Sequence, residues 1–194
     1  DGLTEDERVQ AIERISVTGD RTIRLVSDLT KAFALRGSEL VETEPVNVVS
    51  LCEEVAHELW PLYQAYGKDL RVPPVRRAVV AVGHRELLKR VLVNYADNAL
   101  KYSNDSSVVK FSVLKRDGQV QVGVRDRGPV LSRGDIKRAR QEAPLTGRPL
   151  SSGLGLGVVE HFARCMQGEV GSVRHRDGMT FFVSIPSSEQ LSLL

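Results

Sequence analysis

The first forty residues carry an unbroken heptad pattern, which few folds can accommodate. Between Thr4 and Arg36 there is no Pro and a single Gly. The positions spaced alternately by three and four residues are Val9, Ile12, Ser16, Gly19, Ile23, Val26, Thr30 and Phe33. With Thr4 and Glu7 as a capping box and Gly37 as the stop, the pattern predicts a helix roughly 48 Å long at about 1.5 Å per residue. One compact domain cannot cover so long a stripe, so we expect a dimerising coiled coil or bundle; the alternative is an amphipathic helix folded onto the body of the chain.

Composition excludes several classes of protein and of site. The 194 residues include 27 Lys and Arg against 25 Asp and Glu, a formal net charge of +2. A chain so close to neutral lacks the broad basic field of a general nucleic-acid or membrane-surface binder, so neither contact is expected. Cys52 and Cys165 form no C-x-x-C, which excludes a disulfide framework or cysteine-rich zinc site and predicts reduced thiols. No apolar run reaches the roughly 18 residues of a spanning helix. Since the sequence starts at Asp1 without Met or a signal-peptide pattern, we expect a piece of a longer protein.

After a polar linker over residues 38–44, helix and strand signals alternate. The pattern predicts a helix over 47–66 capped by Asn47 and apolar on one face as far as Leu62, a strand over 78–82, a helix over 83–102, a hairpin of strands 108–114 and 119–126, a helix over 153–167 and a hairpin of strands 169–175 and 179–185. Asp-Gly pairs mark both hairpin turns. Residues 127–152 lack apolar periodicity, and an irregular stretch of that length is typical of a functional lid.

Two amides and a cation share one face of the helix that contains N-Y-A-D-N-A-L-K-Y. At about 100° per residue, Asn94, Asn98 and Lys101 point within roughly 60° of one another at the edge of the apolar stripe. Amide oxygens suit a Mg²⁺ ion held against a polyphosphate, and Lys adds a charge for phosphate. The alternative interpretation is a solvated polar edge.

A carboxylate faces the core at the end of the strand Q-V-Q-V-G-V-R-D. Val120, Val122 and Val124 alternate onto one face, and by the same parity Asp126 also points inward. A buried carboxylate needs a donor, which an adenine amino group could supply, and Gly128 gives the backbone room to approach a flat ligand. The alternative is that Asp126 serves as a helix cap or turn residue.

The segment S-S-G-L-G-L-G opens the helix that follows the irregular stretch. Gly153, Gly155 and Gly157 would expose backbone N–H groups where the helix dipole is positive, a natural phosphate cradle. The G-x-G-x-G spacing after a loop differs from the dinucleotide-binding G-x-G-x-x-G, and G-K-[ST] of a P-loop is missing.

In this order the motifs resemble the ATP-binding domain of sensor histidine kinases, the GHKL or Bergerat fold, over nearly all of residues 45–186. The resemblance implies an α+β fold over 44–187, a two-layer α/β sandwich whose mixed sheet is covered by helices on one face. Residues 1–43 would be the second helix of the dimerisation domain that precedes it, and 188–194 a C-terminal tail. Two copies would then pair through the heptad helix.

The resemblance also assigns roles to individual residues. Asn98 would be the Mg²⁺ ligand, Asn94 its neighbour near the γ-phosphate, and Lys101 a phosphate contact. Tyr102 would flank the base, Asp126 accept from the adenine amino group, and Gly128 complete that pocket. The glycine box would be Gly153, Leu154, Gly155, Leu156 and Gly157, and Thr180 would close the adenine side. ATP-hydrolysing relatives generally have Glu where this chain has Asn94, and an amide cannot remove a proton from water, so phosphoryl transfer or no catalysis is favoured over hydrolysis.

Several positions depart from the family pattern. The D-x-G-x-G box reads D-R-G-P-V, with Val130 at its second Gly, and the lid has no aromatic residue. The lid carries a net charge of +4, from Arg127, Arg133, Lys137, Arg138, Arg140 and Arg148 against Asp135 and Glu142. None of the four histidines lies on the heptad helix, and His57 is interpreted as a packing or surface residue.

These observations predict the catalytic part of a two-component histidine kinase. It would bind ATP and Mg²⁺ and transfer the γ-phosphoryl group to a histidine on an acceptor helix outside this sequence, for relay to a response-regulator receiver domain. The expected location is cytoplasmic, either as a cytoplasmic protein or as the cytoplasmic part of a membrane-bound sensor. A degenerate domain that binds nucleotide or acts as a scaffold is the alternative that Val130 and the missing aromatic box favour, and a mechanical GHKL ATPase is disfavoured by Asn94.

Overall fold

The computed structural model describes residues 41–74, 77–104, 107–141 and 154–188, together with the isolated positions Thr4, Arg8 and Gly19. The chain divides into two compact units, Asp1–Gly37 and Ser38–Leu194. In the first unit Arg8 and Gly19 are helical, and the Arg8 N–H donates to the Thr4 carbonyl at 2.9 Å. The other heptad positions, with Glu7 and Gly37, lie outside the described residues.

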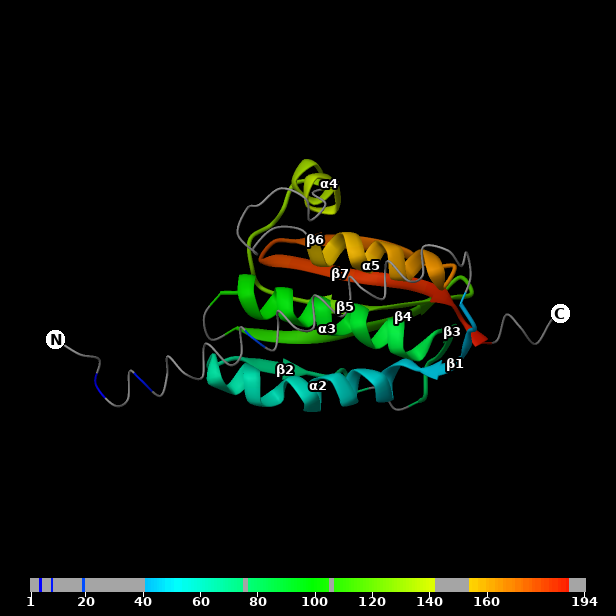
Figure 1. Cartoon of the computed structure of the whole chain (residues 1–194), viewed down its shortest axis with the longest axis horizontal. Coiled ribbons are helices and arrows are strands. Elements are labelled where there is room, and N and C mark those ends of the chain that lie inside the picture. The colour runs from blue at the N-terminus through cyan, green and yellow to red at the C-terminus, as the bar shows by residue number, and fades with distance from the viewer. Residues whose placement is uncertain are drawn as a thin grey trace. The chain divides into compact units, whose positions relative to one another are not determined.

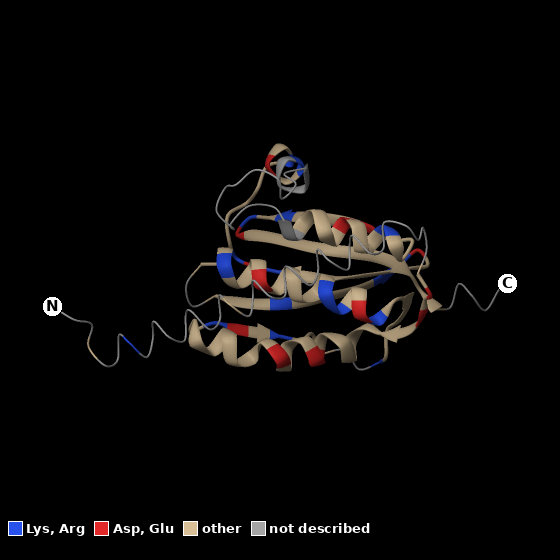
Figure 2. Cartoon of the chain, viewed as in Figure 1, with Lys and Arg blue, Asp and Glu red and all other residues tan. Residues whose placement is uncertain are grey.

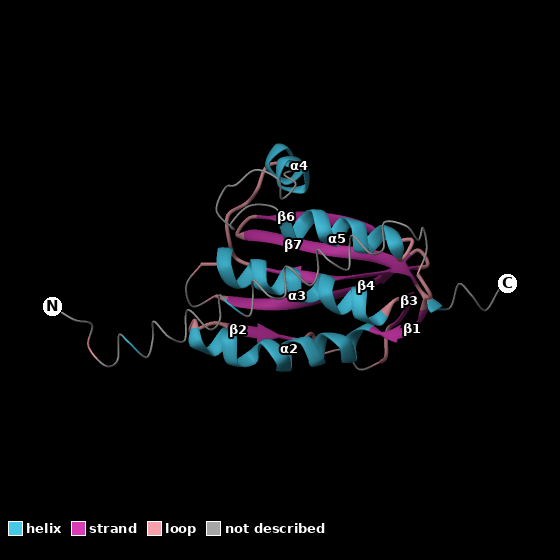
Figure 3. Cartoon of the chain, in the orientation of Figure 1, coloured by secondary structure: helices cyan, strands magenta, loops and turns pink. Residues whose placement is uncertain are grey.

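The second unit is the two-layer α+β sandwich that the sequence predicted. A mixed five-stranded sheet, ordered β2-β4-β5-β7-β6, has β2 parallel to β4 and every other neighbour antiparallel. Its strands are β2 (Asp69–Arg71), β4 (Val108–Arg116), β5 (Gln119–Arg125), β6 (Glu169–His175) and β7 (Gly178–Pro186). Helices α2 (Val48–Ala65), α3 (Arg85–Tyr102) and α5 (Leu154–Cys165) cover one face of the sheet (Figures 1 and 3). A separate antiparallel pair joins β1 (Glu44–Asn47) to β3 (Val80–Gly83).

The core lies between α3 and the central strands. The predicted apolar stripe of α3 is buried in full, at Leu88, Val91, Leu92, Tyr95 and Ala99. Facing it are the alternating valines of β5, each at most 2% exposed, and β7 contributes Phe181, whose ring centroid lies 6.2 Å from that of Tyr95. The Tyr95 hydroxyl donates to the Phe182 carbonyl at 3.2 Å, which satisfies its polar atom within the core. The period-2 and period-3.6 patterns therefore identified both sides of this interface.

Charged pairs join α2 to α3 on the side away from the sheet (Figure 2). Lys89 Nζ lies 2.8 Å from Glu54 and 2.9 Å from Glu58, and Arg85 also pairs with Glu54. The hydrogen bond from Lys89 is the main reason that the pKa of Glu54 is below its usual value. All four side chains are partly exposed, so these pairs orient the helices more than they stabilise them.

Local signals placed most boundaries correctly. Asn47 caps α2, and its Oδ1 accepts the Val49 N–H at 3.2 Å. Asp117 and Gly118 have φ values of 53° and 72°, as expected of the two-residue turn that joins β4 to β5. The helix predicted from residue 83 instead begins at Arg85, because Gly83 ends β3 and His84 is the cap, its Nδ1 accepting the Leu87 N–H at 3.4 Å.

Three elements differ from the expectations. The segment expected to be irregular contains α4 (Arg133–Gln141), where Ser132 Oγ and the Asp135 carboxylate accept each other's backbone N–H groups, both at 3.1 Å. Strands β1 and β2 have four and three residues, too few to show a period in the sequence. On α2, Leu62 is only half-buried and Tyr63 takes the core position.

In the described part of the chain, no helix combines the length and the apolar character that a membrane span requires.

Gly123 tests the packing of β5 against β7. A Cβ at this position would lie 2.0 Å from the Phe181 carbonyl oxygen and 2.6 Å from Phe182 Cα, and neither backbone atom can rotate away. We expect Gly123→Ala to lower the free energy of unfolding by about 1–3 kcal/mol, measured by urea denaturation.

The matched control is Gly134→Ala in α4, where a Cβ would meet only Ser132 Oγ, at 3.6 Å. Because Ala is the better helix former, the control should be neutral or more stable by up to about 1 kcal/mol. Equal stability of the two variants would contradict the observed packing of β5.

Candidate functional site

The C-terminal half of α3 carries the amide and cationic side chains that the sequence singled out. Asn98 Nδ2 donates to Asn94 Oδ1 at 3.1 Å, and both side chains are half-buried. Lys101, one turn further on, is exposed, and its Nζ lies 5.0 Å from the ring centroid of Tyr102, which is 45% exposed. The side-chain oxygen of Asn98, Oδ1, takes no part in the bond between the two amides. It is therefore the oxygen that this face can offer to a cation.

Asp126 lies just beyond β5 and faces the helices, as its parity with the valines predicted. The residue is 8% exposed, and its backbone N–H donates to the Met179 carbonyl at 2.9 Å. Carboxylate Oδ1 accepts the Gly128 N–H at 2.9 Å. Burial raises the pKa of the Asp126 carboxyl above its ordinary value, against the opposing effect of backbone N–H donors and of nearby Arg125 and His175. The two oxygens of a carboxylate can accept more hydrogen bonds than these backbone groups donate, so a buried carboxylate here is suited to a ligand that brings a further donor.

Close packing brings the turn after β5 against the C-terminal end of α3. A Cβ at Gly128 would lie 2.5 Å from the Tyr102 carbonyl oxygen and 3.1 Å from Asp126 Oδ1. The Asn104 N–H also donates to the Arg127 carbonyl at 2.9 Å. The side of Gly128 on which a side chain would lie is therefore occupied by the helix end. This packing places Asp126 beside the helix that carries the two amides.

The structure does not bring Thr180 to this cluster. Thr180 is paired with Arg125 in β7–β5, and residues directly opposite in an antiparallel pair share a face. Because Val124 and Phe181 face α3, Arg125 and Thr180 lie on the helix-free face, where Thr180 Oγ1 is 2.9 Å from His175 Nε2. Met179 is the buried neighbour of Asp126 on the helix side. The alternation of Met179, Phe181, Val183 and Ile185 is the sequence signal that would have shown this.

The glycine segment forms the first turn of α5. Leu154, Gly155, Leu156 and Gly157 are helical, and α5 packs beside both α3 and α4. Gly153 lies outside the described residues, as do the side chains of Arg138 and Arg140, and all of Glu142 and Arg148. Within the described part of the lid, Arg127, Arg133 and Lys137 are exposed and Val130 is 38% exposed. The first N–H groups of α5 have no intrahelical acceptor, as at any helix N-terminus.

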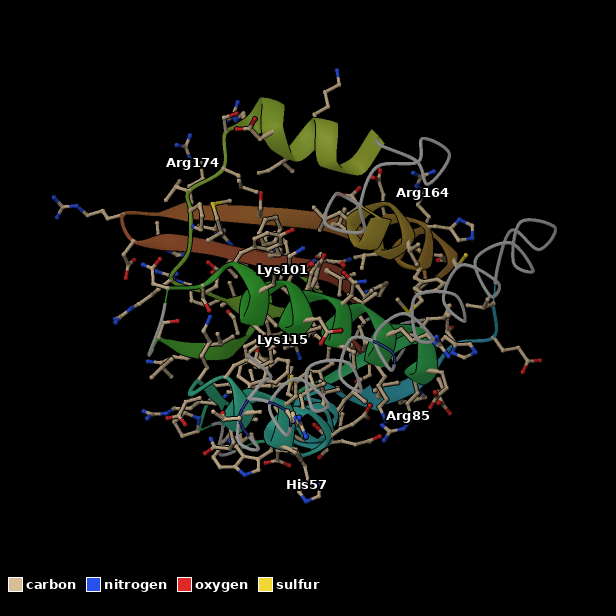
Figure 4. The ribbon with its side chains drawn as sticks, turned by 60° about the vertical axis from the view of Figure 1, so that its left-hand side comes forward. His57, Arg85, Lys101, Lys115, Arg164 and Arg174 are labelled. Carbon is tan, nitrogen blue, oxygen red and sulfur yellow. The ribbon has the colours of Figure 1, made fainter. Side chains whose placement is uncertain are left out.

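The histidines and cysteines have other roles. His57 is exposed on α2 and points away from the body of the unit (Figure 4). Within the described ranges, no group of three or more His, Cys, Asp or Glu side chains could hold a metal ion. Cys52 and Cys165 are free and buried, and burial raises the pKa of the Cys52 thiol to about 12. Both therefore behave as inert structural thiols.

Comparisons with known proteins place the fold in a family. Residues 83–189 match the family described as histidine kinase-, DNA gyrase B- and HSP90-like ATPases. The chain is 30% identical to the adaptive-response sensory kinase SasA of Prochlorococcus marinus over 84% of its own length and 44% of that protein. It spans less than half the length of the curated relatives it matches.

Two solved structures have the same fold. The catalytic domain of the histidine kinase ThkA superimposes with a TM-score of 0.66 at 20% identity, covering 75% of this chain and 96% of that one. Full-length ShkA in complex with AMPPNP gives 0.69 at 25% identity, covering 96% of this chain and 40% of that one.

Asp126→Asn tests the burial of the carboxylate. Since the folded state raises this pKa, the folded chain holds the proton to higher pH than the unfolded chain, and stability falls as pH rises above the ordinary Asp value of 3.8. The free energy of unfolding of the variant, minus that of wild type, should therefore increase between about pH 3 and about pH 7. Urea denaturation across this range measures it, and a constant difference would contradict the assigned burial.

Proposed function

The chain belongs to the histidine kinase-, DNA gyrase B- and HSP90-like ATPase family, and on that premise we propose that residues 44–187 are the ATP-binding catalytic domain of a two-component sensor histidine kinase. The observation that carries the proposal is Asp126, a buried carboxylate packed beside the amide-bearing helix α3. The family fold, the SasA relative and the ShkA structure solved with AMPPNP support it.

Asp126 and Tyr102 form the base-binding part of the proposed site. The carboxylate oxygen not bonded to Gly128 would accept a hydrogen bond from the adenine amino group, and burial strengthens that bond by excluding water. The exposed Tyr102 ring lies at the same helix end and offers an apolar face to the base. Met179, which is buried and whose carbonyl accepts the Asp126 N–H, would supply the neighbouring wall from β7.

The polyphosphate would lie along α3 toward the start of α5. Lys101 would supply a cation, and the N–H groups in the first turn of α5 would supply donors at the positive end of a helix. The side-chain oxygen of Asn98, Oδ1, is suited to be a Mg²⁺ ligand, because an amide oxygen is a hard, neutral donor. The hydrogen bond from Asn98 Nδ2 to Asn94 fixes its orientation. A bound Mg²⁺ would neutralise phosphate charge there.

The amide at position 94 favours transfer over hydrolysis. Asn94 has no proton-accepting group at neutral pH, and its Oδ1 already accepts from Asn98. The domain would then act by holding ATP in line with an acceptor and neutralising its charge. The acceptor histidine would lie on a helix outside this sequence, residues 1–43 would pair two copies as a dimerisation element, and a response-regulator receiver domain would take the phosphoryl group. Residues 188–194 would be a tail.

A degenerate domain that binds nucleotide without transferring phosphate is the second candidate. Val130 at the second glycine of the D-x-G-x-G box and the position of Thr180 on the helix-free face favour it, since both remove features of the family pattern from the base side. This candidate predicts nucleotide binding by the same residues and differs only in the transfer step.

Isothermal calorimetry of the 194-residue chain with ATP and Mg²⁺ tests the binding site. Asp126→Asn should weaken ATP binding about tenfold to a hundredfold, because hydrogen bonds to charged groups contribute ~1.5–3 kcal/mol. Asn98→Ala should reduce the gain in affinity that Mg²⁺ confers. Asp69→Asn, the same change on the partly exposed strand β2, is the control and should leave the affinity within about twofold. A folded chain that binds no ATP would rule the proposal out.

Radiolabelled ATP with a longer protein that includes the upstream acceptor helix separates the two candidates. An acid-labile, alkali-stable phosphohistidine that disappears with Asp126→Asn is the result expected of a kinase. Nucleotide binding without labelling would favour the degenerate domain. Steady release of inorganic phosphate that Asn94→Ala abolishes would instead indicate an ATPase.

A further inference from the structure

Lys68 is the one basic side chain that is buried among the described residues. It is 6% exposed and lies in the turn between α2 and β2. Its Nζ donates to the Leu100 carbonyl at 2.8 Å, to the Ser103 carbonyl at 2.8 Å and to Ser103 Oγ at 3.2 Å. An ammonium group has three N–H donors, so every donor of Lys68 is used at one place, the C-terminal end of α3.

The helix end needs such a partner. The last carbonyls of a helix lack an intrahelical donor, and the dipole makes this end negative. Ser103, the C-cap, and Leu100 would otherwise leave carbonyl oxygens without partners in a region closed to water. A buried cation that donates to both carbonyls satisfies them and is itself stabilised by the helix dipole.

Backbone contacts with the end of α2 hold Lys68 in place. Its backbone N–H donates to the Tyr63 carbonyl at 2.9 Å, and Gly67 adopts a φ of 61°, which turns the chain out of α2. The Tyr63 hydroxyl also donates to the Ala96 carbonyl at 2.8 Å. The end of α2 and the turn after it therefore hydrogen-bond to α3 at two successive turns, at Ala96 and at Leu100.

The end of α3 that Lys68 binds is also the part of this helix that contacts the candidate site. Lys101 and Tyr102 lie between the two residues that Lys68 binds, the Tyr102 carbonyl packs against Gly128, and the Asn104 N–H donates to Arg127. We propose that Lys68 is a positioning residue, which fixes the end of α3 so that Tyr102, Lys101 and the turn carrying Asp126 keep their nucleotide-binding geometry. The inference rests on the proposed function, because it assigns Lys68 a role in that binding without contact to the nucleotide.

Lys68→Met tests it in the 194-residue chain, since Met keeps the length of the side chain and removes its charge and donors. We expect affinity for AMPPNP and Mg²⁺, measured by calorimetry, to fall about tenfold or more, because a helix end that is no longer fixed in the free chain must be ordered when the nucleotide binds. Amide hydrogen exchange at Ser103 and Asn104, whose N–H groups donate to Ala99 and Arg127, should accelerate in the nucleotide-free variant. Lys110→Met, an exposed lysine on β4, is the matched control and should change neither quantity.

A variant destabilised elsewhere separates positioning from general loosening. Leu59→Ala removes a buried side chain of α2 and should lower stability while leaving the AMPPNP affinity of the folded chain unchanged. If Leu59→Ala and Lys68→Met weaken binding equally, or if Lys68→Met binds as wild type does, the inference is overturned. If Lys68→Met does not fold, Lys68→Gln takes its place, with the same expected losses of affinity and exchange protection. Failure of wild type itself to bind AMPPNP would overturn the proposed function first, and this inference with it.

Discussion

Backbone-to-backbone packing between the end of α3 and the turn after β5 is the contact on which the rest of the site depends. Gly128 meets the Tyr102 carbonyl at a separation that leaves no room for a Cβ, and the Asn104 N–H bonds to Arg127. Protein interiors are packed as densely as organic crystals, so such a contact tolerates little displacement. A helix bearing amides and a strand ending in a carboxylate are thereby held as one unit, and that unit is what the proposed nucleotide would recognise.

Two buried charges of opposite sign lie near this contact, and neither neutralises the other. Asp126 is stabilised by the Gly128 N–H, and Lys68 by the Leu100 and Ser103 carbonyls. The two groups differ in how much hydrogen-bonding capacity they leave unused. Lys68 uses all its donors within the protein, as a structural group does, whereas the two oxygens of Asp126 can accept more hydrogen bonds than the backbone groups of Gly128 and Met179 donate. The difference in hydrogen-bond saturation supports a ligand-binding role for Asp126 and a positioning role for Lys68.

Much of the fold was predictable because its signals are local. The Asp-Gly turns, the Asn47 cap and the alternating valines of β5 report backbone geometry over a few residues, and all three were found as expected. Strands β1 and β2 were missed because three or four residues cannot display a period. Helix α4 was missed because Ile136 is its single large apolar residue, and one such residue shows no stripe. Its cap, Ser132 with Asp135, was nevertheless readable in the sequence.

The sequence by itself determined which side chains share a face: Asn94, Asn98 and Lys101 on one helix, and Asp126 with the valines of its strand. Period alone settles this, because helix and strand geometry fix side-chain direction. Tertiary structure decided what those faces meet. It packed the Tyr102 carbonyl against Gly128, and it brought Lys68 to acceptors 32 and 35 positions away. Strand pairing turned Thr180 away with Arg125. Such contacts depend on how separate elements pack, which no local period encodes.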